Sequence, residues 1–500
     1  MSPPAFLAQN EPRDLDSIST ASTGSEPSFL AQIYPFRAWR YKPSAVLLGD
    51  VVTQPYDKIS PAMQQAYYQR SPFNLVRIIL GLPELFDAQG GESVYARAAR
   101  DFRTWREQGV LIQDKTPSVF AYAQRFVVPG SASASGDLRT GVVKERRGFI
   151  ALGRLYDYAD RVVFRHEQTL SKPKSDRLNL LRATRAHFGQ IFMLYSDPAG
   201  SVEKLLYDAE PLGPPDRPAG ISSGEIAYAG NGAPCGEITD EYGVLHRVWR
   251  ISDPAVINRL TTAMADKKLI IADGHHRYET ALNYSREYGA SASAATEHAA
   301  GQLPQPPYPE AAAMMTFVNM DSDGLVILPT HRVVHSLEGF DPAAFTHAAA
   351  RFFAVEPLSA ADPSAYLETL KRQQGTAFVA VTRAGDFLLR SKPEVIRAAL
   401  DDISDRQRQL DLTQLHAIVL ECLLGLSAER IREQTNLRYL RGAAEAVEQV
   451  RRGEADVAFL TNPVTMDQLR EVAFAGEVMP QKSTDFYPKL LSGLAIYALE

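Results

Sequence analysis

Two adjacent histidines and an arginine stand where an apolar run of the sequence gives way to a helical pattern, in "IIADGHHRYETALNY" (270–284). The preceding "KLIIAD" is short, apolar and β-branched, which predicts a buried strand. The spacing of Tyr278, Ala281 and Leu282 predicts a helix that ends at Gly289. Asp273 and Gly274 then form the turn, where a glycine can adopt a backbone conformation that other residues resist.

The three basic residues of this stretch, His275, His276 and Arg277, fall in the first turn of the predicted helix. Cations there oppose the helix dipole, so the arrangement is unfavourable unless an anion binds. The N-terminus of a helix presents N–H groups suited to phosphate, and Arg277 can add a bidentate contact. The sequence therefore predicts an anion site at residues 273–277. The alternative is a surface turn in which Asp273 caps the helix and the basic side chains face water.

These residues resemble a known structural motif. "ADGHHRY" followed by "ETAL" is similar to the strand–Gly–x–His–Arg–helix corner of the ParB and sulfiredoxin superfamily, and closest to the "DGHHR" form of the archaeal free-serine kinases. The resemblance implies a mixed α/β fold with a ParB/sulfiredoxin-like nucleotide-binding core, in which this corner holds nucleotide phosphates. Sulfinic-acid repair, one reaction of that superfamily, is disfavoured because His275 stands where its motif has a cysteine.

A broader resemblance extends along nearly the whole chain. Seven segments occur in the order found in the domain-of-unknown-function-1015 family of bacteria and archaea, which has no settled activity. Its members often lie near serine-biosynthesis genes, which favours a serine-kinase-like reaction. The segments are "YPFRAWRY", "QPYDKIS", "SPFNLVRI", "HEQTLSKPKSDRLNLLRAT", "IADGHHRYETAL", "LPTHRVV" and "MPQKSTDFYPKLLSGL".

A second basic segment, residues 161–187, carries seven Arg or Lys against two acidic residues, although the chain has a net charge of −6. Lys172, Lys174 and Arg177 flank a proline. The pattern predicts that they lie near a loop-to-helix junction with Asp176 as the N-cap. These three residues are candidate phosphate contacts. The alternative is an exposed basic helix face.

Phosphoryl transfer also needs a group that orients the attacking hydroxyl. Asp57, in "VVTQPYDKIS", is a candidate base or Mg²⁺ ligand, although an aspartate in a turn is more often structural. Glu167 follows His166 at the end of the apolar run "RVVF", and such a pair can act as a general base. The serine-kinase resemblance implies a catalytic carboxylate in the N-terminal part, which leaves Asp57 or Glu167. His276 is the further catalytic candidate, if the histidines act directly.

Two later motifs complete the candidate site. "LPTHRVVH" (328–335) is β-branched and predicts a strand. We expect His331 and Arg332, like His166, to contact substrate rather than a metal, because no HExxH accompanies them. "GEVMPQKST" (476–484) nearly spells a phosphate-binding loop, but a helical pattern precedes it where such a loop requires a strand. We reject that motif and keep Lys482 as a possible phosphate contact.

Composition limits the class of protein. The 500 residues are 45% apolar, enough for a large core, and no apolar run approaches the ~20 residues of a membrane span. Two distant cysteines exclude a disulfide scaffold and favour a cytoplasmic protein.

We expect a disordered leader over 1–30 and a ParB/sulfiredoxin-like catalytic region over 31–338. That region carries insertions at 129–141 and 289–310, and a C-terminal α/β region over 339–500 completes the site.

The function expected from the sequence is nucleotide-dependent phosphoryl transfer from ATP or ADP, with Mg²⁺, to the hydroxyl of a small molecule such as serine. The net negative charge disfavours general nucleic-acid or membrane binding. Two alternatives remain open. One is a nucleotide-binding and nucleotide-hydrolysing regulatory switch of the ParB type, and the other is a phosphohydrolase or nuclease that uses no nucleotide.

Overall fold

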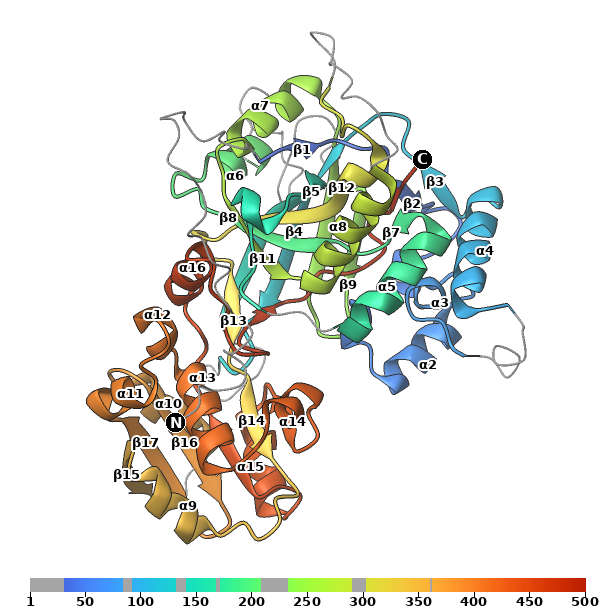
Figure 1. Ribbon diagram of the computed structural model, residues 1–500. Helices are drawn as coiled ribbons and strands as arrows, with labels where there is room; N and C mark the ends of the chain where they lie inside the picture. Colours follow the sequence, from blue (N-terminus) through green and yellow to red (C-terminus); the bar gives the residue numbers. More distant parts are fainter. Residues whose placement is uncertain are drawn as a thin grey trace, which may run out of the picture. The chain divides into compact units, whose positions relative to one another are not determined.

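The computed structural model describes residues 31–83, 92–131, 141–167, 171–207, 233–289, 303–359 and 362–500, the side chains of 171–173 and 289 excepted (Figure 1). The predicted disordered leader lies outside these residues, as do most of the insertions expected at 129–141 and 289–310. The fold is mixed α/β, as predicted. The chain forms two compact units. The larger unit contains Ser28–Phe164, Thr169–Val326 and Pro488–Glu500, and the smaller unit contains Arg165–Gln168 and Ile327–Tyr487.

The larger unit is built on a nine-stranded sheet with the order β6-β11-β8-β12-β5-β4-β10-β9, and β1 pairs with β5 at its side. Only β11–β6 and β12–β8 are parallel; the other pairs are antiparallel. Strands β4 and β5, which flank residues 129–141, pair antiparallel. The strands are β1 (Ile33–Tyr34), β4 (Val119–Val127), β5 (Val143–Arg154), β6 (Val163–Phe164), β8 (Ile191–Tyr195), β9 (Gly236–Thr239), β10 (Leu245–Ile251), β11 (Leu269–Asp273) and β12 (Ala312–Asn319).

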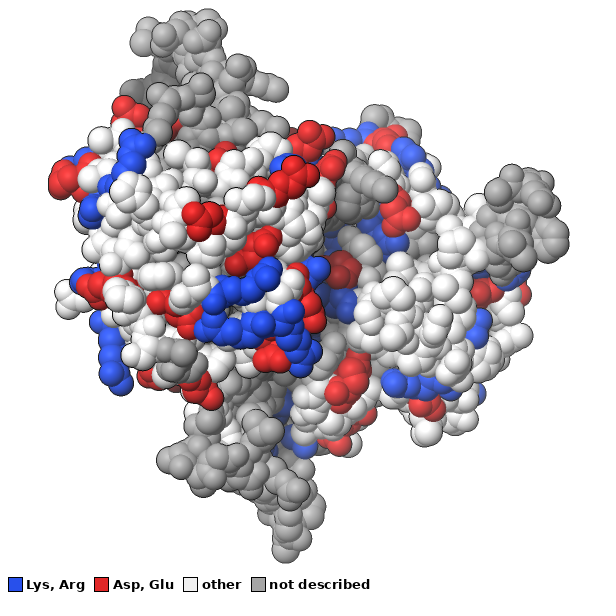
Figure 2. Space-filling model, turned by 90° about the horizontal axis from the view of Figure 1, so that it is seen from below, with Lys and Arg blue, Asp and Glu red and all other residues white. Residues whose placement is uncertain are grey.

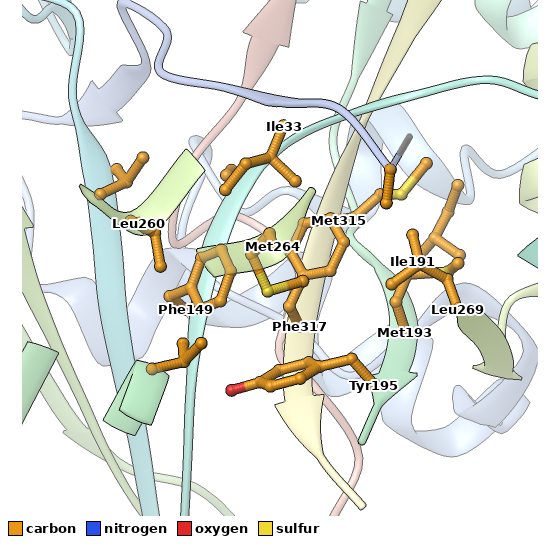
Figure 3. Packing of buried hydrophobic residues seen from close by; sticks show 14 of the residues in the cluster. Ile33, Phe149, Ile191, Met193, Tyr195, Leu260, Met264, Leu269, Met315 and Phe317 are labelled. Atoms are coloured by element: carbon orange, nitrogen blue, oxygen red, sulfur yellow. The ribbon is translucent and has the colours of Figure 1, made fainter. Parts of the chain in front are cut away.

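One face of this sheet is apolar and forms the main core. Its side chains come from alternate positions of the strands, as the two-residue period of a β-strand requires. Phe149 of β5 and Phe317 of β12 stack with ring centroids 5.0 Å apart (Figure 3). Three helices cover this face: α6 (Ser201–Tyr207), α7 (Pro254–Met264) and α8 (His275–Gly289).

The remaining elements of the larger unit form a second cluster of buried residues beside the sheet. Helix α5 packs between α4 and α8 (Figure 1). The elements are β2 (Trp39–Tyr41), α1 (Leu48–Val51), η1 (Tyr56–Lys58), α2 (Pro61–Arg70), α3 (Val76–Ile79), α4 (Val94–Glu107), β3 (Leu111–Gln113), η4 (Tyr158–Asp160), α5 (Ser171–Thr184), β7 (Ala186–His187), η5 (Pro309–Ala311) and β21 (Tyr497–Ala498).

The smaller unit contains a six-stranded antiparallel sheet, ordered β15-β17-β16-β19-β14-β18, with α10 and α15 packed on one face. The strand predicted around His331 is present as β14. The elements are β14 (His331–Val334), α9 (Pro342–Ala349), β15 (Phe353–Leu358), α10 (Pro363–Lys371), β16 (Ala377–Thr382), β17 (Asp386–Ser391), α11 (Pro393–Ala399), α12 (Asp405–Arg408), α13 (Asp411–Gln414), the π-helical η6 (Leu415–Leu423), α14 (Ala428–Glu433), β18 (Leu437–Leu440), α15 (Ala443–Arg451), β19 (Val457–Leu460) and α16 (Met466–Phe474). Strands β13 (Val326–Leu328) and β20 (Asp485–Tyr487) pair with each other in a separate two-stranded sheet.

One local prediction is wrong. Lys172, Lys174 and Arg177 lie near the start of a helix, as predicted, but α5 already begins at Ser171, before Asp176. A proline is tolerated in the first turn of a helix, where its missing N–H has no partner to lose. Asp176 is therefore not the N-cap. It lies inside the helix, where its carboxylate accepts a hydrogen bond from Tyr95 Oη at 2.9 Å and pairs with Arg177.

Charge is mixed over the visible surface. On the face shown in Figure 2, Lys and Arg side chains alternate with Asp and Glu, and the largest basic group in view is bordered by acidic residues. No helix in the described part of the chain is long and apolar enough to cross a membrane. On the face shown, basic side chains thus lie among acidic ones rather than in an extended basic surface.

Candidate functional site

The predicted turn from strand to helix is confirmed: β11 ends at Asp273 and α8 begins at His275. Gly274 between them has a φ of +92°, and its carbonyl accepts the N–H of Tyr278 at 2.9 Å. A Cβ atom at this position would lie 2.9 Å from the Arg277 guanidinium. Glycine is therefore required twice, for the backbone conformation and for the close approach of the arginine. We call Asp273–Arg277 the corner.

Asp273 does not cap the helix. Its two carboxylate oxygens face cations, with Arg277 Nη2 at 2.7 Å from Oδ2 and Lys489 Nζ at 3.2 Å from Oδ1. Burial alone raises the pKa of Asp273, but Lys489, Arg277 and Lys58 together hold it below its usual range. Three cations thus surround one buried carboxylate, at the end of a helix where the dipole is also positive. The interpretation of Asp273 as an N-cap is wrong, because the tertiary fold brings Lys489 to its carboxylate.

A pocket that is open to solvent adjoins the corner through Arg277. Its wall is largely apolar, and two guanidinium groups and several hydroxyl or ring groups interrupt it. We call it the Arg177–Arg277 pocket. It is lined by Pro55, Tyr56, Ile79, Arg177, Leu180, Leu181, Ala186, His187, Phe188, Gly189, Arg277, Thr280 and Ser492.

The two arginines of the pocket are held in fixed orientations. Arg277 donates through Nη1 to the Gln190 carbonyl as well as to Asp273. Arg177 donates to Asp176 and, at 2.7 Å, to the carbonyl of Ile79, while its guanidinium lies 4.1 Å from the centre of the Tyr56 ring. Both side chains are mostly buried, at 16% and 11% exposure. Their charges are therefore little screened and are oriented before any ligand arrives.

Tyr56 and His187 add polar groups to the same wall. Burial raises the pKa of Tyr56, with Asp57 adding to the effect and Arg177 opposing it. Burial lowers the pKa of His187 to about 4, and its ring stacks on Tyr497. Both groups are therefore neutral near pH 7 and can serve as hydrogen-bonding partners without adding charge.

The basic residues predicted on α5 separate into different roles. Arg177 lines the pocket. Lys174 forms an ion pair with Glu279 of α8 instead. The side chain of Lys172 lies outside the described residues. Asp57 lies in η1, exposed, between Tyr56 of the pocket wall and Lys58, whose charge acts on Asp273.

The other predicted residues belong to the smaller unit. His166, His331 and Arg332 are all fully buried there. Arg332 donates to His416 Nε2 at 3.3 Å and to the carbonyls of Gln481 and Lys482 at 3.3 and 3.1 Å. We call this group the Arg332 cluster; its members are His166, Glu167, His331, Arg332, His416 and Tyr439.

Two histidines of this cluster each have one ring nitrogen in contact with a neighbouring group of the smaller unit. His166 Nε2 lies 2.8 Å from Thr484 Oγ1, and His331 Nδ1 accepts the backbone N–H of Thr461 at 3.3 Å. Burial, with the nearby Arg332 charge, lowers the pKa of His331 to about 4. Burial also lowers the pKa of Arg332 to about 10.

Sequence reasoning missed Lys489, Tyr56 and His187. Lys489 stands in the motif "MPQKSTDFYPKLLSGL", but the near match to a phosphate loop drew attention to Lys482 in the same motif. Tyr56 is the neighbour of Asp57 in "QPYDKIS". Lys489 and Tyr56 thus both stand in motifs that the sequence analysis singled out. However, nothing in the local sequence distinguishes Lys489 from Lys482.

Comparison with protein families gives a match over residues 33–413 to the model described as "Protein of unknown function (DUF1015)". The chain belongs to the DUF1015 family. The resemblance seen in the sequence motifs is thereby confirmed. No curated protein matches the chain.

Solved structures similar to this DUF1015 protein include three of interest. A conserved hypothetical protein from Pyrococcus furiosus is 12% identical over 65% of this chain and 87% of its own, with a TM-score of 0.30. A free serine kinase in complex with AMP is 14% identical over 67% and 89%, with a TM-score of 0.31. SbnI with a C-terminal truncation, from Staphylococcus aureus, is 9% identical over 69% and 85%, with a TM-score of 0.31. TM-scores this low do not establish a shared fold or chemistry.

Proposed function

We propose that this DUF1015 protein transfers a phosphoryl group from a nucleotide, ATP or ADP, to the hydroxyl of a small molecule such as serine. The observation that carries the proposal is the Arg177–Arg277 pocket, which joins an apolar wall to two fixed guanidinium groups. A nucleotide has the same division, with a flat apolar base at one end and a polyanion at the other.

The phosphates belong at the corner end of the pocket. Arg277 is shared by the corner and the pocket wall, and the cations around Asp273 exceed its single negative charge. The backbone N–H groups of His275 and His276, in the first turn of α8, suit phosphate oxygens. The apolar side chains Ile79, Leu180 and Phe188 then receive the base. The "DGHHR" resemblance to the free-serine kinases supports the same orientation.

Asp57 is the carboxylate that we assign as the base. It is exposed and lies between Tyr56, on the pocket wall, and Lys58. In the proposed step the acceptor oxygen bonds to the terminal phosphorus, the bond from phosphorus to the nucleotide breaks, and the hydroxyl proton passes to Asp57. Glu167, the other carboxylate considered from the sequence, belongs to the smaller unit and serves below as the comparison.

Magnesium is the cofactor that this chemistry implies. The described residues contain no group of three His, Cys, Asp or Glu side chains placed to hold a metal, and both Asp273 oxygens face cations. A magnesium ion at a phosphoryl-transfer site needs only one or two carboxylates, with substrate phosphates and water completing its shell. Asp57 fits that requirement. When bound, the ion would neutralise charge on the phosphates.

The first experiment is a thermal-shift screen against ATP, ADP, CTP, GTP and pyrophosphate with Mg²⁺. A ligand at a hundred times its Kd stabilises a protein by about 2.7 kcal/mol, which is readily visible. We expect a clear shift for wild type and for Asp57→Asn, and a much smaller one for Arg277→Ala. A wild-type protein that shows no shift with any of these ligands would contradict the proposal.

The second experiment measures transfer to serine and other small hydroxyl compounds with the nucleotide found in the screen. We expect Asp57→Asn to lose transfer while it retains nucleotide binding, and Glu167→Gln to retain both. If Glu167→Gln lost transfer and Asp57→Asn retained it, Glu167 rather than Asp57 would be the base. Hydrolysis without any acceptor dependence would favour the regulatory switch over the kinase.

A further inference from the structure

We infer that Lys489 is a phosphate-contacting residue of the corner, and that a row of buried polar side chains on the central sheet positions it. The identity of the ligand rests on the proposed function, whereas the placement of Lys489 follows from the fold. Lys489 Nζ lies 3.2 Å from Asp273 Oδ1, and its side chain is only 9% exposed. It reaches the corner from a part of the chain 216 residues away.

The row consists of His246, Gln124 and Arg146, which lie directly opposite one another on β10, β4 and β5. It lies on the sheet face opposite the apolar core. Arg146 donates through Nε to Gln124 Oε1 at 3.0 Å, and its guanidinium lies 4.7 Å from the centre of the Phe192 ring. Gln124 Nε2 lies 3.3 Å from His246 Nδ1.

His246 completes the row as a neutral ring. Burial lowers its pKa although Asp240 opposes the effect, so the ring carries one proton near pH 7. Its Nε2 lies 3.2 Å from Asp240 Oδ2, and its Nδ1 lies 2.7 Å from Tyr122 Oη. The arrangement fits the tautomer that donates to Asp240 and accepts from Tyr122.

This row holds the backbone on both sides of the Lys489 amide nitrogen. Arg146 Nη2 donates to the carbonyl of Pro488, and Gln124 Nε2 donates to the carbonyl of Lys489 itself at 2.8 Å. Three residues further on, the N–H of Ser492 donates to the carbonyl of Thr53 at 2.8 Å. The segment is thus fixed by side chains that are buried and bonded to each other, so the position of Lys489 does not depend on its ion pair with Asp273 alone.

Charge balance explains why Lys489 does more than neutralise Asp273. Arg277 already occupies Asp273 Oδ2, and Lys58 adds a third charge that acts on the same carboxylate. Three cations thus act on one carboxylate, and this local excess of positive charge favours an added anion. An ammonium group is a compact point charge that suits phosphate oxygens.

The test compares pyrophosphate and ADP binding by calorimetry in wild type, Lys489→Met and Lys482→Met. The last variant is the matched control, because it removes a lysine from the same motif but in the smaller unit. We expect Lys489→Met to weaken pyrophosphate binding by roughly 10- to 100-fold. We expect Lys489→Arg to recover most of that affinity, and Lys482→Met to match wild type.

A double-mutant cycle separates positioning by the row from general loss of structure. We expect Gln124→Met to weaken pyrophosphate binding by about 3- to 10-fold, and Gln124→Met with Lys489→Met to be no weaker than Lys489→Met alone. Additive losses would contradict the positioning role. Lys489→Met with wild-type affinity, beside an Arg277→Ala that no longer binds, would overturn the inference and leave the proposed function intact. Wild-type protein that binds neither ligand would overturn both.

Discussion

The corner in the larger unit and the Arg332 cluster in the smaller unit are built from similar residues but have different surroundings. In the cluster, Arg332 is fully buried, and its donors go to a histidine and to backbone carbonyls. In the corner, Arg277 is partly exposed, and it lines a pocket together with Arg177. Both regions were selected from the sequence because basic residues stand beside strand ends.

The difference shows that the acceptors of an arginine, rather than its motif, indicate its role. Arg332 and Arg146 each bind carbonyl groups of the C-terminal motif, at residues 481–482 and at residue 488. A buried arginine satisfied by backbone carbonyls organises the chain around it. The corner instead gathers more cations than Asp273 can neutralise, which is the condition for binding an anion.

The largest effect that would test this contrast is on stability. We expect Arg332→Met to destabilise the smaller unit by about 3–5 kcal/mol, because its buried acceptors lose their donor. The three tryptophans, Trp39, Trp105 and Trp249, all lie in the larger unit. Loss of helical circular dichroism should therefore precede the change in tryptophan fluorescence during urea unfolding. Coincident transitions with an unchanged midpoint would contradict a structural role for Arg332.

The next effect is on the pH dependence of stability. His331 is fully buried, and its folded-state pKa of about 4 lies below the ordinary value of 6.5. Between these values the unfolded state binds a proton that the folded state does not, so stability is complete above pH 6.5 and falls as the pH drops toward 4. The loss for this histidine is about 2 kcal/mol at pH 5 and about 3 kcal/mol below pH 4.

Urea unfolding at pH 8 and pH 5, followed by circular dichroism, measures this loss. His331→Gln should be less sensitive to pH than wild type, because glutamine can still accept the N–H of Thr461 but cannot titrate. Equal sensitivity in the two proteins would mean that His331 is protonated at pH 5 without cost.

The third effect is on binding. We expect Arg277→Ala to weaken nucleotide binding by roughly 30- to 100-fold, equivalent to about 2–3 kcal/mol, because a charge-assisted contact is lost from a largely buried site. Arg332→Met, measured at a temperature where it remains folded, should bind the nucleotide as wild type does. Calorimetry on both variants shows which region binds the nucleotide. Equal losses of affinity in the two variants would show that the Arg332 cluster also binds phosphate.

The smallest effect distinguishes basic residues on the same helix. Lys174 pairs with Glu279, and both side chains are partly buried, so we expect Lys174→Ala to cost about 1 kcal/mol of stability and to leave nucleotide affinity unchanged. Arg177→Ala should reduce affinity, because its guanidinium lines the pocket. If Lys174→Ala lost as much nucleotide affinity as Arg177→Ala, the whole basic face of α5 would contribute to binding.

Local features of the fold were predictable because they depend on neighbouring residues. The strand ending at Asp273, the turn at Gly274 and the helix from His275 to Gly289 all follow from side-chain periodicity and from glycine. The start of α5 was missed because a proline indicates a helix end in most positions, whereas Pro173 lies in the first turn.

The candidate site was only partly predictable. Arg177 and the corner were identified from local charge and turn patterns. The sequence did not show that the remaining basic and histidine residues belong to two units. Residues 166, 177 and 277 all fall within the catalytic region predicted over 31–338. The return of Pro488–Glu500 to the larger unit was equally hidden.

By itself the sequence determined the corner: an anion-compatible turn, its glycine, its arginine and the helix that follows, all within residues 273–289. Only the tertiary structure decided which distant cation joins it. Lys482 and Lys489 stand seven positions apart in one motif, but Lys489 alone reaches Asp273, because Arg146 and Gln124 hold its backbone. Such placement depends on strands that pair across long separations, and no local pattern encodes that pairing.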